Sequence, residues 1–562
     1  MNLNTLFSRV IPHICGIITI SYTPFASIDP TSPVKMAILG TCAFTIFLII
    51  ITTYPVGLKS NTQVLLVVFL FVTDLFLVFF LSSENKIEQF YGSISRNFGL
   101  LTQLALAVFL LAATIFSSPN IIMRLKKSVI VYGSINMIYG FIQVMGLDFV
   151  KNWETTYVNS ARGFFANPNQ NSSFTALVAL VSISNLLNSK RKITEHLGSI
   201  SFLFIAIVNI YFSRSTQGYL ILIFGLMLLF LLYLRQSAVY SKYFIPAVLA
   251  VIGFSFLAIL DIFQKLPWKS FLYSSTIEAR GDYWRTGLEM GTNNPIFGVG
   301  LDKYLEWYRI YRNDAAAARS YAEEVSNSAH NVFIDYFAFG GFPLLLLYLL
   351  LQFLVVLKLF RIIKSNSAYN SELVTLILIF SSFTLQSLVS PVHIGFHIWG
   401  WVTMGLVLGW KLYQSDESEI NTKSKREPVN NKNIIVSKSK FILVSLLGLS
   451  LGFMTSSPYF VQETRFRNGV YGVKSEREIL NAASIKPKSS YRMAQAAWKL
   501  YVNGFKESSL KLALDAVAYS PNNYYGWLVL YSMVDLDPEL TEVVKINIER
   551  LEPRPGNIRK IM

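Results

Sequence analysis

Long apolar runs are the feature that most constrains the fold of this chain. A bilayer core about 30 Å thick requires roughly 20 apolar residues for each helical span. The sequence contains thirteen such runs, separated by charged residues or by clusters of Pro, Gly and Asn. They cover residues 9–27, 35–54, 63–82, 98–117, 128–147, 171–188, 197–213, 218–234, 244–262, 331–357, 371–389, 394–411 and 441–457. The predicted fold class is therefore all-α: a polytopic membrane helical bundle of about 13 transmembrane helices.

The overall composition agrees with a membrane protein. Hydrophobic residues make up 53% of the chain and charged residues 15%, a balance more apolar than soluble domains carry. The net charge of +16 suits nucleic-acid binding or cytoplasmic loops, and in a multi-spanning chain the loops are the better explanation, so no nucleic-acid partner is expected. Cys15 and Cys42 both lie in apolar runs, which predicts buried packing and neither a disulfide nor a thiolate metal site.

Basic residues in the loops predict the orientation, because Lys and Arg in short loops are retained on the cytoplasmic side. Alternate loops carry the basic residues: Lys59, 124–127, 190–192, Arg235 with Lys242, 358–364 and 423–440. An odd number of spans then places the N-terminus inside and everything after residue 457 outside. The prediction is a multi-pass protein of a bacterial inner membrane, with a membrane domain at 1–457 and a periplasmic region at 458–562. The first run is interpreted as an anchor.

The same parity places four unusually polar segments on one outer face. They are residues 161–173, 213–217, a large loop at 262–330 and the short turn at 390–397. A bundle that only anchored the C-terminal region would not need these segments. The sequence therefore predicts a functional site at the outer membrane interface.

Three arginines of this face are candidates for binding phosphate. Arg214 lies between two apolar helices with almost no loop, where a snorkelling side chain at a helix end is the alternative explanation. Arg280 and Arg285 follow in the large loop. Several guanidinium groups on one face can receive phosphate oxygens in bidentate fashion, so the set favours an anionic substrate.

His330 is one of only five histidines, and it stands where the polar loop turns into a long apolar run. With an ordinary pKa of about 6.5, an imidazole there can accept a proton at neutral pH. The alternative is a histidine that caps the helix or packs at an interface. Together with the arginines, His330 predicts displacement at a carbon whose leaving group is a phosphate: the arginines hold the diphosphate, and the histidine deprotonates an incoming hydroxyl.

Three other patterns predict less. His393 and His397 have the i, i+4 spacing of metal ligands, but no Glu lies between them and no third ligand is evident, so no metal is expected. The Gly-Val-Gly at 298–300 has no preceding strand and no third glycine, so it is interpreted as a turn. Asn167-Pro168-Asn169 is interpreted as a turn that opens a helix, with Asn169 or Asn171 as the cap, and secondly as a sugar-binding patch.

The ordered set of motifs resembles a known family. "GFFANPNQNSS", "SRSTQGYL", "ARGDYW" followed by "NNPIFGVGLDKY", and "SAHNVFIDYFAFGG" are similar in order and spacing to the motifs of the O-antigen ligase superfamily. That superfamily also contains O-antigen polymerases and the bacterial O-oligosaccharyltransferases that glycosylate pilins. The resemblance covers roughly residues 35–412. It implies a metal-independent glycosyltransferase without a cofactor that takes a glycan from undecaprenyl diphosphate on the outer face of the inner membrane.

The resemblance also implies roles for individual residues and partners. Arg214 and Arg280 correspond to the diphosphate-binding arginines of the family and His330 to its catalytic histidine. Possible additional substrate contacts are Arg162, Asn167, Asn169, Ser213, Arg285 and Asn331. The partners implied are the lipid-linked glycan donor, an acceptor that is lipid A-core, a glycan or a protein, and membrane lipids. A single direct displacement would invert the anomeric centre.

The C-terminal region adds a different pattern. Residues 491–533 show Ala, Leu and aromatic residues at helical spacing and end one helix at 520–522, which is typical of one or two tetratricopeptide-like hairpins. Fewer than three repeats seldom stand alone, so the region is expected to dock on the outer loop or on a partner, or else to serve only as a cap. Extended periplasmic regions of this kind resemble those of the protein-glycosylating branch.

Two other classes of protein stay open. A lipid or solute transporter would also be a large helical bundle, but it should show internal repeats and broken helices near the bilayer midplane. A structural scaffold that presents the C-terminal hairpins would tolerate loss of Arg214, Arg280 and His330, whereas an enzyme would not.

Overall fold

The structure is a computed structural model. It describes residues 2–53 except 24 and 26, then 62–148, 159–187, 193–237, 239–262, 264–267, 275–319, 325–365, 370–421, 437–472, 475–533 and 537–553. Within these ranges the chain is built from helices and contains no strand, which confirms the all-α fold class.

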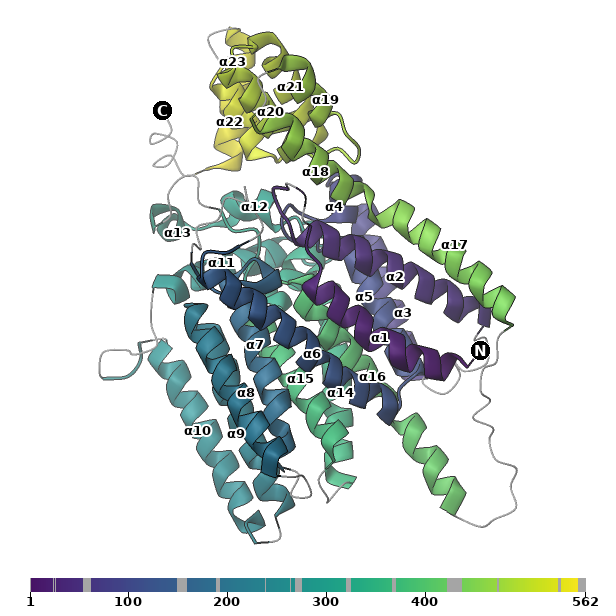
Figure 1. Cartoon of the computed structure of the whole chain (residues 1–562). Coiled ribbons are helices and arrows are strands. Elements are labelled where there is room, and N and C mark those ends of the chain that lie inside the picture. Colours follow the sequence, from purple (N-terminus) through teal and green to yellow (C-terminus); the bar gives the residue numbers. More distant parts are fainter. Residues whose placement is uncertain are drawn as a thin grey trace.

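The helices form a slanted bundle, a thin layer above it and a group of C-terminal helices at the top (Figure 1). The bundle contains α1 (Leu3–Ile20), α2 (Ser32–Thr53), α3 (Thr62–Leu81), α5 (Leu100–Ile115), α6 (Pro119–Val144), α7 (Pro168–Ile183), α8 (Ile193–Phe212), α9 (Thr216–Gln236), α10 (Phe244–Ile262), α14 (Val332–Ser365), α15 (Ser371–Val389), α16 (Ile394–Asn421) and α17 (Lys438–Ser456). The layer contains α4 (Lys86–Tyr91), α11 (Ser275–Asn293), α12 (Tyr304–Tyr311) and α13 (Asp314–Arg319).

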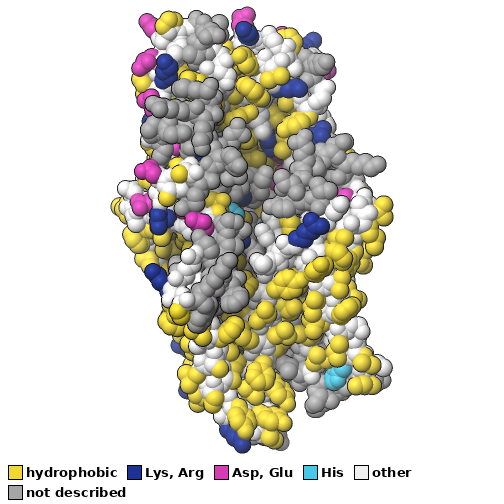
Figure 2. All heavy atoms as spheres, turned by 90° about the vertical axis from the view of Figure 1, so that its left-hand side faces the viewer, with side chains coloured by type: hydrophobic (Ala, Val, Ile, Leu, Met, Phe, Trp, Pro, Cys, Tyr) yellow, Lys and Arg dark blue, Asp and Glu magenta, His cyan; other side chains and the backbone are white. Residues whose placement is uncertain are grey.

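Among the described residues, eight helices are long and apolar enough to cross a membrane: α1, α2, α3, α8, α9, α14, α15 and α17. Three shorter apolar helices span 100–115, 241–257 and 394–410. Hydrophobic side chains cover most of the lower part of the molecule, whereas Asp and Glu side chains appear only in the upper part of the visible face (Figure 2). The chain is a multi-pass membrane protein, while the count of thirteen spans stays a prediction.

A buried lysine joins the first two helices. The Lys35 Nζ donates to the backbone carbonyls of Ile18 at 3.0 Å, Thr19 at 2.6 Å and Ser21 at 2.7 Å. The carbonyls at the C-terminal end of a helix lack intrahelical partners and carry partial negative charge, so they receive an ammonium well. Lys35 therefore fixes the C-terminal end of α1 against the start of α2.

Small residues hold α17 against α2. A Cβ added at Gly448 would lie 2.7 Å from Thr45 Cα, and one at Gly452 would lie 2.8 Å from Thr41 Cα. This four-residue spacing of glycines is a common means of close helix contact in membranes, where small residues let backbones approach. Because α17 leads into the C-terminal region, this contact fixes the point from which that region begins.

A glycine kink divides α14 into an outer and an inner part. Gly340 and Gly341 leave the helical conformation, with φ of 66° at Gly341. The freed backbone groups bond to the loop before α12: the Val299 amide donates to the Ala338 carbonyl at 2.8 Å. A Cβ at Gly298 would lie 2.3 Å from the Phe339 carbonyl carbon, so only glycine fits there. The Gly-Val-Gly at 298–300 is thus a turn packed on α14, as predicted.

The C-terminal region is a compact group of helices with its own core. It contains α18 (Pro458–Val470), α19 (Glu476–Ala483), α20 (Ser490–Val502), α21 (Lys506–Tyr519), α22 (Tyr524–Tyr531) and α23 (Pro538–Leu551). Arg492 forms a buried bidentate pair with Glu463, at 2.8 and 2.7 Å. The predicted helix end at 520–522 is confirmed, since α21 ends at Tyr519. The tetratricopeptide-like character stays a prediction.

Polar contacts hold the C-terminal helices against α12 and the segment after α3. Glu84 accepts from Trp307 Nε1 at 3.0 Å and from Asn522 Nδ2 at 2.8 Å. Glu552 pairs with Arg309 at 3.0 Å and also with Arg312. These bonds join the C-terminal helices to α12 and to the segment after α3, which is the docking expected for hairpins too few to stand alone.

Candidate active site at the outer face

Polar segments that are far apart in the sequence meet at one end of the bundle. The Ser215 Oγ donates to Asn169 Oδ1 at 2.7 Å, which joins the turn between α8 and α9 to the start of α7. The Ser390 Oγ donates to Gln217 Oε1 at 2.7 Å, which adds the turn between α15 and α16. Three of the four predicted polar segments are therefore in direct contact.

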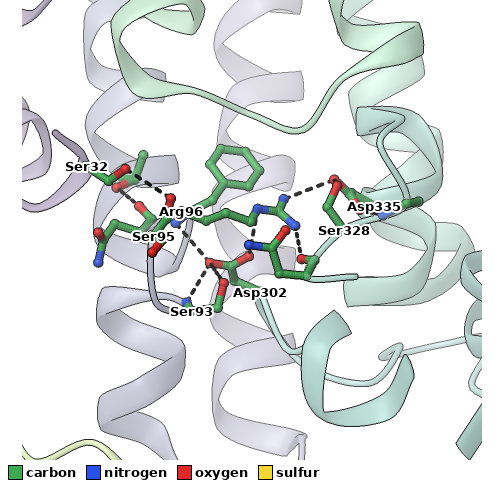
Figure 3. A network of polar contacts seen from close by, with 12 residues as sticks. Ser32, Ser93, Ser95, Arg96, Asp302, Ser328 and Asp335 are labelled. Atoms are coloured by element: carbon green, nitrogen blue, oxygen red, sulfur yellow. Dashed lines mark hydrogen bonds and ion pairs between the residues drawn. The ribbon is translucent and has the colours of Figure 1, made fainter. Parts of the chain in front are cut away.

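The end of the fourth segment, the large loop predicted at 262–330, is held by Arg96 (Figure 3). The Arg96 guanidinium pairs with Asp335 at 3.0 Å and lies 3.5 Å from Asp302, and it also donates to the carbonyl of Asn327. Asp335 in turn accepts from Ser328 Oγ at 3.0 Å and from the Ala329 amide at 2.8 Å. A buried, planar guanidinium that bridges two carboxylates and a carbonyl fixes the loop geometry.

This network ends at His330. The His330 amide donates to Ser328 Oγ at 2.8 Å, so the chain of contacts runs from Arg96 through Asp335 and Ser328 to the histidine backbone. His330 has φ of 53°, in the left-handed region, where residues other than Gly are uncommon but Asn, Asp and His are enriched. Asn331, and not His330, caps α14, because Asn331 Oδ1 accepts from the amides of Phe333 and Ile334 at 3.0 and 3.3 Å. The imidazole is therefore not needed to begin the helix.

The imidazole itself faces a small hollow. His330 Nδ1 lies 3.3 Å from the Ser328 carbonyl, and since a carbonyl only accepts, Nδ1 carries the proton and Nε2 keeps its lone pair. None of the hydrogen bonds among the described residues engages Nε2. A hollow of about 320 Å³ is lined by His330 with Tyr283, Leu305 and Tyr491, among others. The Tyr283 ring lies beside the imidazole, with ring centroids 5.1 Å apart.

Burial sets the protonation state of this histidine. Desolvation lowers the pKa of His330 to about 4, and the positive charges of Arg280 and Arg96 lower it further in the same direction. The imidazole is neutral at physiological pH, which is the form that can accept a proton. The histidine is thus available as a base, although its lowered pKa makes it a weaker one than an exposed imidazole.

The helix α11 brings Arg280 to this site. Gly287 and Gly291 face α14: a Cβ at Gly291 would lie 2.4 Å from the Phe337 ring, and one at Gly287 would lie 2.6 Å from the Ile334 side chain. Arg280 is half-buried, and desolvation lowers its pKa from the ordinary value. The positive charge of Arg280 lowers the pKa of His330, so these two predicted site residues are near enough to interact electrostatically.

Arg214 occupies a separate position in this conformation. It is exposed, with φ of 54°, in the turn between α8 and α9. None of the contacts among the described residues joins Arg214 to Arg280 or His330. Arg285 is also exposed and lies five residues after Arg280, about 140° further around α11, so the two side chains leave the helix in different directions.

The other predicted substrate contacts are engaged inside the protein. Arg162 pairs with Asp148 at 2.7 Å. The fully buried Ser213 accepts from Asn171 Nδ2 at 3.0 Å. Asn167 Oδ1 accepts from the amides of Asn169 and Gln170 at 2.8 and 3.4 Å.

Asn167 is therefore the cap of α7. The prediction that Asn169 or Asn171 caps this helix was wrong, because Pro168 occupies the first helical position and the residue before it becomes the cap.

The two histidines at 393 and 397 bond to backbone groups. His393 Nδ1 accepts from the Gly395 amide at 3.2 Å, and His397 Nδ1 accepts from the His393 amide at 3.4 Å. His397 is fully buried. Within the described residues, no group of three or more His, Cys, Asp or Glu side chains could hold a metal ion.

Sequence reasoning missed the residues that position His330: Arg96, Asp302 and Asp335. A signal was present for Arg96, since the segment between the runs at 63–82 and 98–117 falls on the same outer face by the predicted parity. Asp335 lies a few residues after His330, within an apolar run that was assigned to a membrane span, so it was not considered as part of the site. Only the fold shows that these three charges meet.

At one end of this multi-pass helical membrane protein, a neutral imidazole at His330 lies within the electrostatic reach of Arg280. Residues 201–349 match the family model for O-antigen ligase, and this segment contains Arg214, Arg280 and His330. The chain therefore carries an O-antigen ligase domain at 201–349, which confirms the family resemblance of the motifs that lie within this segment. The coarse function that follows is glycan transfer in polysaccharide biosynthesis. A search of curated proteins found no match to the chain.

Proposed function

We propose that this protein transfers a glycan from undecaprenyl diphosphate to an acceptor hydroxyl on the periplasmic face of a bacterial inner membrane. Arg280 and Arg214 bind the diphosphate, and His330 is the general base. The observation that carries the proposal is the geometry of His330, a neutral imidazole that lines a hollow, has no hydrogen bond to Nε2 among the described residues, and lies within the electrostatic reach of Arg280. No metal or cofactor takes part in the proposed reaction.

The chemistry is a single displacement. The acceptor hydroxyl gives its proton to His330 Nε2 while its oxygen forms a bond to the anomeric carbon of the donor glycan. The bond from that carbon to the diphosphate oxygen breaks, and the electron pair leaves with undecaprenyl diphosphate. Arg280 and Arg214 stabilise the negative charge that develops on the leaving group. A displacement of this kind inverts the anomeric centre.

The exposed position of Arg214 bears on this mechanism. A guanidinium at the turn between two apolar helices can meet a lipid diphosphate at the membrane surface before it reaches the partly buried His330. Ser213 and Ser215 on either side are fixed by internal bonds, so the backbone of Arg214 is held while its side chain is free to follow the ligand. This arrangement favours a lipid-linked substrate over a soluble nucleotide sugar.

The acceptor can be lipid A-core, a second glycan repeat unit or a protein such as a pilin. The docked C-terminal helices favour an acceptor that extends above the membrane, and this includes the pilin-type O-oligosaccharyltransferase and O-antigen polymerase alternatives. A lipid or solute transporter is the less favoured alternative, since it would not require a base in the outer loop.

The test is glycan transfer by the purified protein in nanodiscs. The donor is an undecaprenyl-diphosphate oligosaccharide, and the acceptors are lipid A-core, a pilin and a second repeat unit. We predict that His330→Asn lowers transfer by about 10²- to 10⁴-fold, because asparagine cannot accept the proton. Asparagine tolerates the left-handed conformation at 330, so this variant is expected to fold.

His196→Asn is the matched control, because His196 lies in α8 and is not one of the residues assigned to the site, and this variant should transfer at the wild-type rate. Donor binding by His330→Asn, measured by calorimetry, should remain near wild type. Transfer by His330→Asn at the wild-type rate would show that the base lies elsewhere. Failure of all three acceptors with the wild-type protein would contradict the proposed reaction.

A further inference from the structure

A second, larger cavity lies between the outer layer and the C-terminal helices. Its volume is about 550 Å³, and its walls come from the segment after α4, from α12 and from α20 and α22. It shares four lining residues with the hollow at His330, namely Ile94, Leu305, Val325 and Tyr491. The two spaces are therefore neighbours, and a ligand in the larger one lies next to the candidate active site.

Aromatic rings make up much of the wall. Tyr491 and Tyr525 have ring centroids 5.5 Å apart, and Trp498 lies on the same helix as Tyr491. Such rings offer flat apolar faces with a polar edge. The rings of a pyranose sugar match this surface, because their C–H faces are apolar and their edges carry hydroxyl groups.

Two neighbouring residues of the wall, Asn523 and Tyr524, are among the described residues with a buried polar atom that lacks a partner. Asn523 and Tyr524 are 6% and 8% exposed, and neither the Asn523 Nδ2 nor the Tyr524 hydroxyl has a hydrogen-bond partner among the described residues. The Asn523 Oδ1 is already used, since it accepts from the Gly526 amide at 3.1 Å. Buried polar groups are nearly always paired in native proteins, so unpaired ones in a cavity wall point to a polar ligand.

The charges of the wall are mostly cancelled. Lys303 pairs with Glu88 at 2.5 Å and with Glu306 at 2.8 Å, and Arg309 pairs with Glu552 at 3.0 Å. Lys488 is the remaining charged residue of the lining. A diphosphate would find little free positive charge here, whereas a ligand rich in hydroxyl groups finds aromatic faces and open hydrogen-bonding sites.

From these observations we propose that the cavity between the outer layer and the C-terminal helices is an oligosaccharide-binding site. Its volume is within the range of about 300–1,000 Å³ typical of small-ligand sites. The proposal rests on the proposed function, because the oligosaccharide is the glycan of either the donor or the acceptor. The common chemistry is a short chain of pyranose rings, bound by Tyr491, Trp498 and Tyr525 and by the donors of Asn523 and Tyr524.

The first experiment measures binding of free oligosaccharides to the full-length protein by calorimetry. The probes are the glycan released by mild acid from the host's lipid-linked donor, and the core oligosaccharide released by mild acid from lipid A-core. Tyr524→Phe removes only the unpaired hydroxyl, and Asn523→Asp keeps the cap on α22 while it removes the amide donor. Each is expected to weaken binding of one probe by about fivefold, the loss of one hydrogen bond. Tyr471→Phe, at an exposed tyrosine outside the cavity, is the matched control.

Steady-state kinetics distinguish the two sources of the glycan. If the site holds the acceptor glycan, Tyr524→Phe raises KM for the acceptor and leaves KM for the donor unchanged. If it holds the donor glycan, the reverse is expected. Either result supports the proposal. Wild-type binding by both variants would overturn it, and so would binding of a pilin without binding of either oligosaccharide.

The outcome for this site can be separated from that for the proposed function. His330→Asn should bind the oligosaccharide as the wild type does while it fails to transfer. If the protein binds an oligosaccharide but transfers glycan to no acceptor, the proposed function is contradicted and this inference is still supported. Transfer by a protein that binds neither oligosaccharide would contradict this inference and support the proposed function.

Discussion

Two of the three residues assigned to the chemistry, Arg214 and His330, share a left-handed backbone, with φ of 54° and 53°. Residues in this region are uncommon when they are not glycine and are concentrated at functional sites. In His330 the conformation is held by Ser328, which accepts from the His330 amide at 2.8 Å. The His330 side chain lines the hollow, while Asn331 caps the helix that follows.

The lowered pKa of His330 predicts the pH dependence of transfer. A base must be deprotonated, so activity is lost as the pH falls through its pKa. Because burial lowers that pKa to about 4, the acid limb of kcat/KM should lie well below the value of about 6.5 for an exposed imidazole. Arg280→Gln removes a positive charge that lowers the pKa, so the limb of its residual activity should move to higher pH.

The measurement is the pH profile of kcat/KM for wild type and Arg280→Gln, with Arg285→Gln as the control on the same helix. Arg285→Gln should leave the acid limb in place, since Arg285 is exposed and does not act on His330. A wild-type limb near 6.5, or a shift to lower pH in Arg280→Gln, would contradict the buried site described above.

Arg96 is expected to position His330 without touching substrate. In Arg96→Lys the charge stays but the planar fork that joins Asp302, Asp335 and the Asn327 carbonyl is lost. Loss of one or two charge-assisted bonds predicts a fall of about 10- to 100-fold in kcat. The donor KM should change little, because the diphosphate contacts remain.

Arg477→Lys, at an exposed arginine of the C-terminal region, is the control for this variant. Thermal unfolding in detergent shows whether Arg96→Lys is folded at the assay temperature. A folded Arg96→Lys enzyme with wild-type kcat would show that the loop holds its geometry without this network.

At this scale the sequence predicted that His330 and Arg280 share one face but not the residues that support them, and their chemical roles stay predictions. His330 and Arg280 were expected on one outer face, and the structure brings them together. The positions of Asp302 and Asp335 could not be predicted, because one lies in a glycine-rich turn and the other in an apolar run, and neither has a local partner in the sequence. Their roles depend on contacts across more than 200 residues of chain.

At the scale of the helices, glycines decide how closely α11 approaches α14. Gly287 and Gly291 lie one turn apart on the face toward α14, and a Cβ at either position would overlap the Ile334 or Phe337 side chain. Small residues at this spacing permit close contact between helices. The distance between these helices determines where Arg280 and Tyr283, one to three turns earlier, stand relative to His330.

Gly291→Val is therefore expected to lower both stability and transfer. Overpacking of a close contact costs about 1–3 kcal/mol, and the displaced α11 carries Arg280 and Tyr283 away from His330. Gly281→Ala is the matched control, because a Cβ there meets nothing within 4 Å. The melting temperature in detergent and the transfer rate measure both effects. Equal behaviour of the two variants would show that the contact does not set the site geometry.

The apolar runs predicted the helices well and their ends less well. The first run was predicted at 9–27, but α1 spans Leu3–Ile20 because the Asn2 side chain caps it, accepting from the amides of Asn4 and Thr5. The kink in α14 was not predicted, since Gly340 and Gly341 look like ordinary small residues of a span. Caps and kinks depend on single hydrogen bonds and on packing with the turn at 298–300, which hydropathy does not register.

At the scale of the whole molecule, the two ends of the bundle differ in chemistry. The docked C-terminal helices lie at the same end of the bundle as the His330 site. Contacts of Glu84, Glu88 and Glu552 hold them there. The basic loops predicted to be cytoplasmic were identified from alternation along the chain. The segment at 423–440 lies partly outside the described residues, so its role in orientation rests on sequence alone.

The orientation leads to a prediction from three single cysteines in a background of Cys15→Ser and Cys42→Ser. Thr5→Cys stands at the start of α1, Ser439→Cys at the start of α17 and Lys511→Cys in α21, all at exposed positions. Because α17 is apolar enough to span the membrane, positions 439 and 511 should lie on opposite sides. The basic loops place 439 inside and, if the number of spans is odd, place 5 inside as well.

A membrane-impermeant maleimide applied to spheroplasts should therefore label Lys511→Cys at once, and the other two only after permeabilisation. Labelling of 439 and 511 from the same side would show that α17 does not cross the membrane. Labelling of both 5 and 511 from outside would mean an even number of spans, which contradicts the count of thirteen. His330 would still lie outside in that case, because its site is at the same end of the bundle as the C-terminal helices, but the spans before it would have to be assigned again.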